Sequence, residues 1–159
     1  MASVQSVCHC ITPDYFSILN LKTMKITIKS DKKITEFQQE FTAFFPYLKV
    51  EFFTHPHDEG AATGSKYMIS KRTKTLGELA EIQDESDFVF TPEMTVGIFE
   101  QALWNQYALA VQVFRKSMGS YIETTTSDKW TLSKQNSEGD ESSHSILEMV
   151  YEQRTNEMD

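Results

Sequence analysis

The stretch MKITIKSDKKITEFQQEFTAFFPYLKVEFF, residues 24–53, decides the expected fold. Residues 24–29 alternate apolar and polar side chains, which is the period of a half-buried strand. Ser30-Asp31 then offers a helix cap, and apolar residues recur at intervals of three and four until Pro46 ends the helix. Residues 48–53 have the composition of a second strand. A strand, a helix and a strand in this order predict a right-handed βαβ unit.

The rest of the body continues this mixture of helix and strand signals. Thr75 and Glu78 have the spacing of a capping box before a short helix. The next expected elements are a third strand at 66–71 and a brief strand or hydrophobic lead-in at 88–90. A long helix at 96–107, with Thr95 as a candidate cap, and a β-hairpin at 111–125 that turns at 117–120 follow them. We therefore predict one α+β domain over residues 24–136, with a mixed β-sheet of four to six strands and two main helices packed on one face. A ferredoxin-like βαββαβ core is one arrangement that fits.

Both ends of the chain differ from this body. Residues 1–23 mix polar and apolar side chains without a period, which indicates either a mispredicted start or a disordered arm. Residues 137–159 form an acidic tail, and the composition between 133 and 145 is typical of disorder. A short apolar stripe at helical spacing follows, consisting of Ile146, Leu147, Val150 and Tyr151. Two interpretations stay open: the stripe docks on a partner protein, or it packs back on its own domain or stays loose.

The charge of the chain is concentrated in that tail. The 159 residues carry a net charge of −8, and from residue 138 onward seven acidic residues stand against Arg154, a net charge of −6 that leaves −2 for the body. Hydrophobic residues make up 40% of the chain, which is too many for a disordered protein, and the apolar runs are too short to span a membrane. No secretory pattern opens the chain, and cysteine occurs only at Cys8 and Cys10. We therefore expect a cytoplasmic protein without a membrane partner.

Several short motifs in the second half of the body are shared with a known family. The motifs are Thr95-Val96, Phe99-Glu100, the run from Val111 to Lys116, Glu123-Thr124-Thr125, Asp128, Trp130-Thr131-Leu132 and Gln135-Asn136. Over residues 95–136 the chain resembles a family of small, uncharacterised bacterial proteins. The resemblance implies a bacterial cytosolic domain, and it carries no catalytic residue across.

The densest set of reactive side chains follows the second predicted strand. It consists of His55, His57, Asp58 and Glu59. Two imidazoles at i and i+2 on extended backbone point the same way, and the adjacent carboxylates could complete a divalent metal site or act as a general base. The competing interpretation is a polar turn that Pro56 stiffens.

Basic residues gather in two places along the chain. The candidates for contact with nucleic acid are Lys66, Lys71, Arg72, Lys74, Arg115 and Lys116. If the two groups converged on one face of the sheet, charge and stacking on nearby aromatic rings would hold a single strand. Lysines that guard solvated strand edges explain the same residues without a ligand.

The sequence favours a binding protein over an enzyme. No Ser-His-Asp or Cys-His arrangement can be drawn from it, and no cofactor is predicted. The leading hypothesis is a non-enzymatic protein-interaction module whose partner is another protein. The alternatives are a metal-dependent, hydrolase-like site on residues 55–59 and a binder of single-stranded nucleic acid. The oligomeric state stays open.

Overall fold

The computed structural model describes residues 22–56 and 64–156, with side chains described up to Ser145 and at Arg154. The predicted arm at 1–23 therefore lies almost wholly outside the described residues. The strands are β1 (Met24–Ile28), β2 (Leu48–Phe52), β3 (Ser86–Phe90), β4 (Val111–Ser117) and β5 (Ser120–Glu123). The helices are α2 (Ile34–Phe44), α3 (Val96–Tyr107) and α4 (Leu132–Asn156), with short 3-10 turns at Ser65–Tyr67, Leu76–Glu78 and Thr125–Ser127. The α+β class is confirmed.

The strands form two antiparallel sheets instead of the single mixed sheet that the sequence predicted. β1 pairs with β3 in one sheet, and the other has the order β2-β4-β5. The predicted βαβ unit is wrong, because β1 and β2 belong to different sheets. The ferredoxin-like arrangement is not confirmed either, because it would need both strands in one sheet. The physical reason is that α2 buries apolar side chains toward both sheets at once.

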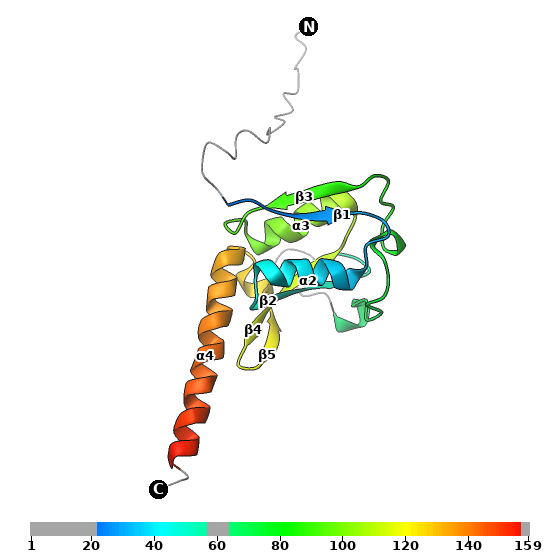
Figure 1. The fold of residues 1–159 in the computed structure, drawn as a ribbon. Coiled ribbons are helices and arrows are strands. Elements are labelled where there is room, and N and C mark those ends of the chain that lie inside the picture. The colour runs from blue at the N-terminus through cyan, green and yellow to red at the C-terminus, as the bar shows by residue number, and fades with distance from the viewer. Residues whose placement is uncertain (1–21, 57–63, 157–159) are drawn as a thin grey trace.

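The two long helices of the body lie between the two sheets (Figure 1). The Phe37 ring of α2 meets Phe52 of β2 edge-on at 5.3 Å, and Phe41 of α2 meets Phe99 of α3 at 5.2 Å. Phe99 also contacts Phe90 of β3 at 5.3 Å, which joins α3 to the two-stranded sheet. All five rings are buried. Each such side chain contributes about 1.5–3 kcal/mol by burial, so this aromatic column holds both sheets to the helices.

The segment between β2 and β3 contains less regular structure than predicted. The prediction of a third strand at 66–71 is wrong. One 3-10 turn covers Ser65–Tyr67, and a single bridge joins Met68 to Phe53. The predicted capping box is confirmed, since Thr75 N donates to Glu78 Oε2 at 2.7 Å, although the helix that it starts is one 3-10 turn. The brief strand at 88–90 is confirmed as part of β3.

The predicted hairpin is confirmed as β4 and β5. Its two central turn residues, Met118 and Gly119, have φ of 48° and 80°. Positive φ at both positions is typical of a type I′ turn, whose twist matches that of the flanking strands. The hairpin extends from the body in the same direction as α4 (Figure 1).

The prediction of disorder over residues 133–145 is wrong, because these residues form the first half of the 25-residue helix α4. The polar residues of this segment have partners on the body: Gln135 accepts from Arg115 Nη1 at 3.0 Å, and Asn136 Oδ1 accepts from Tyr47 N at 3.0 Å. Beyond the hairpin, α4 runs away from the body (Figure 1). Across residues 22–56 and 64–156, no helix has both the length and the apolar character that crossing a membrane requires.

Candidate functional site

A cavity of about 440 Å³ lies beside α3 and is the candidate functional site. We call it the α3 cavity. Its lining consists of Thr95, Gly97, Ile98, Glu100, Gln101 and Trp104 from α3 and its cap, Ala110 and Val111 at the start of β4, Asp128 and Lys129 after the last 3-10 turn, and Pro56.

The α3 cavity exists because β5 is shorter than β4. β5 pairs only with Phe114–Ser117, so the first half of β4 has no strand on that side. There the backbone of Val113 is satisfied by side chains: its N–H donates to Glu100 Oε1 at 2.7 Å, and its carbonyl accepts from Thr124 Oγ1 at 2.9 Å. Peptide groups of alternate residues in a strand point to the same side, so the N–H and C=O of Val111 point to the same side of β4 as those of Val113. Val111 lines the cavity there.

Two carboxylates lie in the cavity wall. Glu100 and Asp128 are 5% and 7% exposed, and both line the cavity. The backbone fixes their relation, because Gly97 N donates to Asp128 O at 3.0 Å and Glu100 follows Gly97 by one helical turn. Lys129 is the one cationic side chain in the described lining. The described wall therefore contains two acidic side chains and one basic side chain.

The outer part of the α3 cavity is apolar. Ile98 is 55% exposed and Trp104 is 38% exposed, and both belong to α3. The helix is fixed at its start by Thr95, whose Oγ1 accepts from Ile98 N at 3.4 Å, as the sequence predicted for this cap. Exposed apolar side chains beside a concave, charged wall are typical of interaction surfaces.

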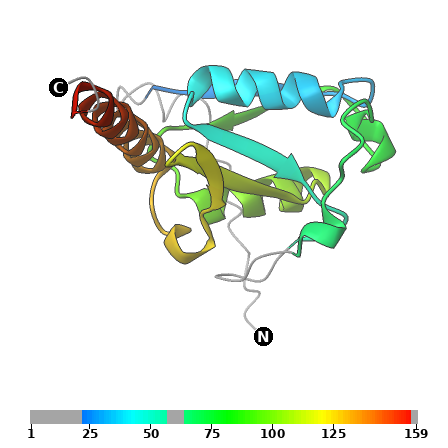
Figure 2. The same cartoon turned by 90° about the horizontal axis from the view of Figure 1, so that it is seen from below.

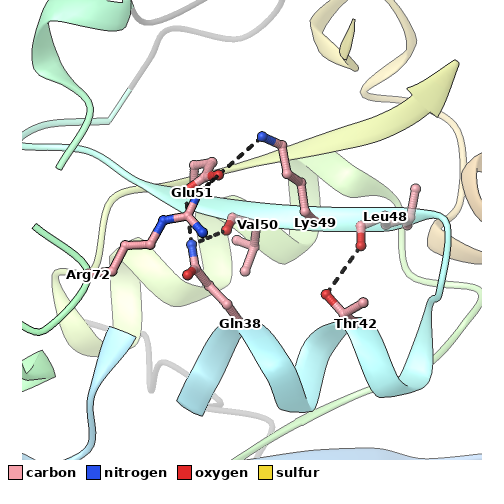
Figure 3. A network of polar contacts seen from close by, with 7 residues as sticks. All are labelled: Gln38, Thr42, Leu48, Lys49, Val50, Glu51 and Arg72. Atoms are coloured by element: carbon pink, nitrogen blue, oxygen red, sulfur yellow. Dashed lines mark hydrogen bonds and ion pairs between the residues drawn. The ribbon is translucent and has the colours of Figure 1, made fainter. Parts of the chain in front are cut away.

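A second polar cluster closes the outer edge of β2 (Figure 3). The Glu51 carboxylate is 5% exposed and lies 3.1 Å from Lys49 Nζ and 3.5 Å from Arg72 Nη2. Gln38 of α2 donates from Nε2 to Glu51 Oε2 at 2.9 Å and to Val50 O at 2.8 Å. Thr42 Oγ1 donates to Leu48 O at 3.4 Å. These side chains occupy strand carbonyls that would otherwise face solvent, so the cluster is a structural edge guard.

The predicted metal site falls mainly outside the described residues, since His57, Asp58 and Glu59 lie there. His55 is exposed, with its Nδ1 3.0 Å from Thr54 Oγ1 and its ring 4.1 Å from the Tyr67 ring. Within 22–56 and 64–156, no three acidic, histidine or cysteine side chains are grouped as metal ligands would be. The metal site on residues 55–59 stays a prediction.

The structure does not bring the six predicted nucleic-acid contacts together. Lys66, Lys71, Arg72 and Lys74 belong to the segment that crosses the end of β2, where Ile69 N donates to Phe52 O at 2.8 Å. Arg115 pairs with Leu48 at the other end of the same strand, and Lys116 follows it. Figure 2 shows that this segment and α4, which contacts Arg115, lie at opposite ends of the body. The two basic groups do not share a surface, and nucleic-acid binding stays a prediction.

Several of these basic residues already have local partners. Arg72 lies beside Glu51, and Lys66 Nζ lies 4.7 Å from the centroid of the Tyr67 ring. Arg115 donates to Gln135 and lies over the Trp130 ring at 5.7 Å. These contacts fit the structural interpretation better than a shared ligand surface.

The predicted partner-binding stripe lies on α4. Ile146, Leu147, Val150 and Tyr151 fall within the helix, but their side chains lie outside the described ones. Spacings of three and four residues, as from 146 to 150, from 147 to 150 and from 147 to 151, place the four positions on one side of an α-helix. Partner binding by the stripe stays a prediction.

Sequence reasoning missed the residues that form the α3 cavity. One signal for Glu100 was available: it follows Val96 by four residues and precedes Leu103 by three, so an acid stood on the face expected to be buried. Asp128 carried no such signal, because a loop brings it to the helix. Neither a protein-family model, nor a curated protein, nor a solved structure matches this chain.

Proposed function

We propose that this chain is a non-enzymatic protein-interaction module, and that its α3 cavity receives a lysine or arginine side chain of a partner protein. The observation that supports the proposal is the pair of nearly buried carboxylates, Glu100 and Asp128, in the wall of a cavity with an apolar rim.

Charge and size both favour a basic side chain as the occupant. Burial in low dielectric makes a carboxylate costly unless positive charge or hydrogen bonds compensate it. Glu100 Oε1 already accepts from Val113 N at 2.7 Å, and a basic side chain in the cavity would add a charged donor for the two acidic side chains. The volume of about 440 Å³ lies within the range of about 300–1,000 Å³ that ligand pockets span. It accommodates one long side chain together with part of its backbone.

The rim supplies the remaining contact. Trp104 and Ile98 are large, exposed and fixed on a helix, so they lose little conformational freedom when a partner covers them. Tryptophan and arginine are the residues most often found at the energetic centre of protein interfaces. A partner that inserts a basic side chain and covers the Trp104 ring would use both features.

Among the described lining residues, the one hydroxyl has a structural role. Thr95 provides the one hydroxyl among the described lining residues, and that oxygen caps α3 by accepting from Ile98 N. Its helix-capping role explains the residue without a part in chemistry. Thr95 is therefore not expected to act as a nucleophile.

The test uses a minimal probe, N-acetyl-arginine amide, titrated into the full chain and followed by NMR of backbone amides. We expect shifts at Gly97, Gln101 and Lys129, and no comparable shifts with the citrulline analogue, which has the same shape without the charge. Asp128→Asn should weaken binding about tenfold, because a hydrogen bond to a charged group contributes about 1.5–3 kcal/mol. Shifts scattered over the surface, or equal binding of citrulline, would contradict the proposal.

A matched pair of aromatic variants tests the rim. Trp104→Ala should weaken binding of a tripeptide probe with a central arginine, whereas Phe44→Ala should not. The two side chains have nearly the same exposure, 38% and 37%, and both lie on helices, but only Trp104 lines the α3 cavity. Equal effects of the two substitutions would remove the rim from the proposal.

A further inference from the structure

The three-stranded sheet has two edges, β2 and β5, and they differ in how their outward peptide groups are satisfied. On the β2 edge, three successive outward carbonyls have partners. Leu48 O accepts from Thr42 Oγ1, Val50 O accepts from Gln38 Nε2, and Phe52 O accepts from Ile69 N. An edge whose acceptors are already occupied is a poor template for another strand.

The β5 edge is different, and the register shows why. Lys116 pairs with Tyr121, but Lys116 N donates to Tyr47 O at 2.8 Å, on the opposite side of β4. Tyr121 is therefore in a non-hydrogen-bonded pair, and its own N–H and C=O point away from β4. The peptide groups of Glu123, two residues on, point the same way. Within residues 22–56 and 64–156, no hydrogen bond reaches these four groups.

The side chains of β5 are exposed as well. All four of its residues are exposed, including Tyr121 at 41% and Ile122 at 42%, and Met118 of the turn is 66% exposed. The strand contains neither lysine nor proline, the residues that most often guard an edge. In Figure 1, α4 runs along the hairpin beside β4, so none of the described helices and strands covers the edge of β5.

We propose that β5 pairs with β5 of a second copy of this chain, antiparallel across a two-fold axis, so that two three-stranded sheets become one continuous sheet. The register places Ile122 on the axis, with Tyr121 opposite Glu123 of the partner subunit. This register satisfies every outward peptide group of both strands, because Tyr121 and Glu123 exchange both of their hydrogen bonds with their counterparts. With the axis on Tyr121, Glu123 would lie opposite Gly119 of the turn. With the axis on Glu123, Tyr121 would lie opposite Thr125 of the 3-10 turn, so either shift leaves outward peptide groups without a strand partner.

Charge supports the same register. Lys49 Nζ lies 4.8 Å from the centroid of the Tyr121 ring, and Lys116 pairs directly with Tyr121. Glu123 of the partner subunit would lie beside Tyr121 on this positively charged face. On the other face, the two Ile122 side chains would form a non-hydrogen-bonded cross-strand pair, the closest kind of side-chain contact in an antiparallel sheet.

The interface is small. A pair of four-residue strands buries less than the ~1,200 Å² of a stable complex, so we expect a weak dimer that forms with rising concentration. The inference is independent of the proposed function, because the α3 cavity lies beyond the end of β5.

The experiment compares two substitutions of one residue in the full chain, by sedimentation equilibrium over a range of concentrations. Tyr121→Pro removes an outward N–H that β4 does not use, whereas Tyr121→Ala removes the ring and keeps the N–H. We expect self-association of the unmodified chain and of Tyr121→Ala, and at least an about tenfold weaker dimer for Tyr121→Pro, since the symmetry counts each lost bond twice. A monomer at every concentration, or equal dimerisation of Tyr121→Pro, would overturn the proposal.

Crosslinking keeps the proposal testable if Tyr121→Pro fails to fold. In a chain with Cys8→Ser and Cys10→Ser, Ile122→Cys should form a disulfide-linked dimer on mild oxidation, because the two-fold axis places residue 122 opposite its copy. Ser120→Cys, exposed on the same strand but off the axis, is the matched control. Equal crosslinking at both positions would contradict the register.

Discussion

The helix α4 has two parts that differ in their contact with the body. Its first three turns, up to Ser142, are docked on the body, and the remainder of the helix is not. The first part is rich in serine, asparagine, glutamine and acid, yet it is docked: Leu132 and Gln135 are fully buried, and Met118 N donates to Ser142 Oγ at 3.0 Å. From Ser143 to Ser145 the side chains bond back to their own helix, as in Ser143 Oγ to Gly139 O at 2.7 Å. The helix then leaves the body, although its apolar stripe lies in this part (Figure 1).

Composition is a poor guide to docking when polar side chains have defined partners. Gln135 accepts from Arg115 and donates to Ser127 O at 3.1 Å and to Ser127 Oγ at 2.7 Å, so its amide is satisfied inside the protein. Burying a polar group costs little free energy when all its hydrogen bonds are made, whereas burying the same group without them would oppose docking. Four variants test the comparison, in order of the effect expected.

Gly139→Ala should be the most damaging change. A Cβ at residue 139 would lie 2.7 Å from Tyr47 Cβ and 3.2 Å from Tyr47 O, so the docked part of α4 would have to move away from β2. We expect a loss of about 2–3 kcal/mol in the free energy of unfolding, measured by urea denaturation, although alanine gains about 1 kcal/mol over glycine in a free helix. Ser137→Ala, exposed on the same helix, is the control and should be near neutral. A Gly139→Ala protein as stable as the unmodified chain would show that α4 is not docked here.

Gln135→Ala should have the next largest effect. It removes the acceptor of Arg115 and the donor to Ser127 from a fully buried position, so we expect a loss of about 1–2 kcal/mol in the free energy of unfolding. A double-mutant cycle with Arg115→Ala isolates the pair. The two losses should add to more than that of the double variant, and simple additivity would argue against the Gln135–Arg115 bond.

Tyr47→Phe should have a smaller, pH-dependent effect. A hydrogen bond to the Asp140 carboxylate raises the pKa of Tyr47 above its ordinary value of 10.0. Because the folded pKa is raised, the stabilisation from this bond is complete below the unfolded pKa and is lost as pH rises through the folded pKa. The difference in unfolding free energy between the unmodified chain and Tyr47→Phe should therefore vanish at high pH. Tyrosinate absorbance should show one tyrosine titrating late, and Asp140→Asn should abolish that delay.

Removal of residues 146–159 should have the smallest effect. The backbone of this part runs away from the body, so we expect a change in unfolding free energy within ~0.5 kcal/mol. The measurement decides between the two interpretations of the apolar stripe. A clear loss of stability would show that the stripe packs back on its own domain, and no loss leaves it available to a partner.

Local elements of the fold were predictable because their signals are short-range. The alternation over β1, the apolar spacing of α2, the cap at Thr95 and the hairpin of β4 and β5 were all predicted and are confirmed. The division into two sheets was not predictable in this way, because strand pairing depends on contacts between residues distant in sequence, such as Phe90 with Phe99 and Phe41 with Phe99. The same holds for the α3 cavity, whose acids come from a helix and from a loop further along the chain.

Local sequence patterns were enough to assign the chain to the α+β class, to locate α2, α3 and the hairpin, and to show that its charge is concentrated near the carboxyl end. Periodicity and turn chemistry carry that information residue by residue. Long-range packing determines which strands pair, the docking of the polar start of α4 beside Tyr47, and the shared cavity of Glu100 and Asp128. Those outcomes depend on the geometric fit of groups far apart in the chain, such as the close approach of Gly139 to Tyr47, which no local pattern encodes.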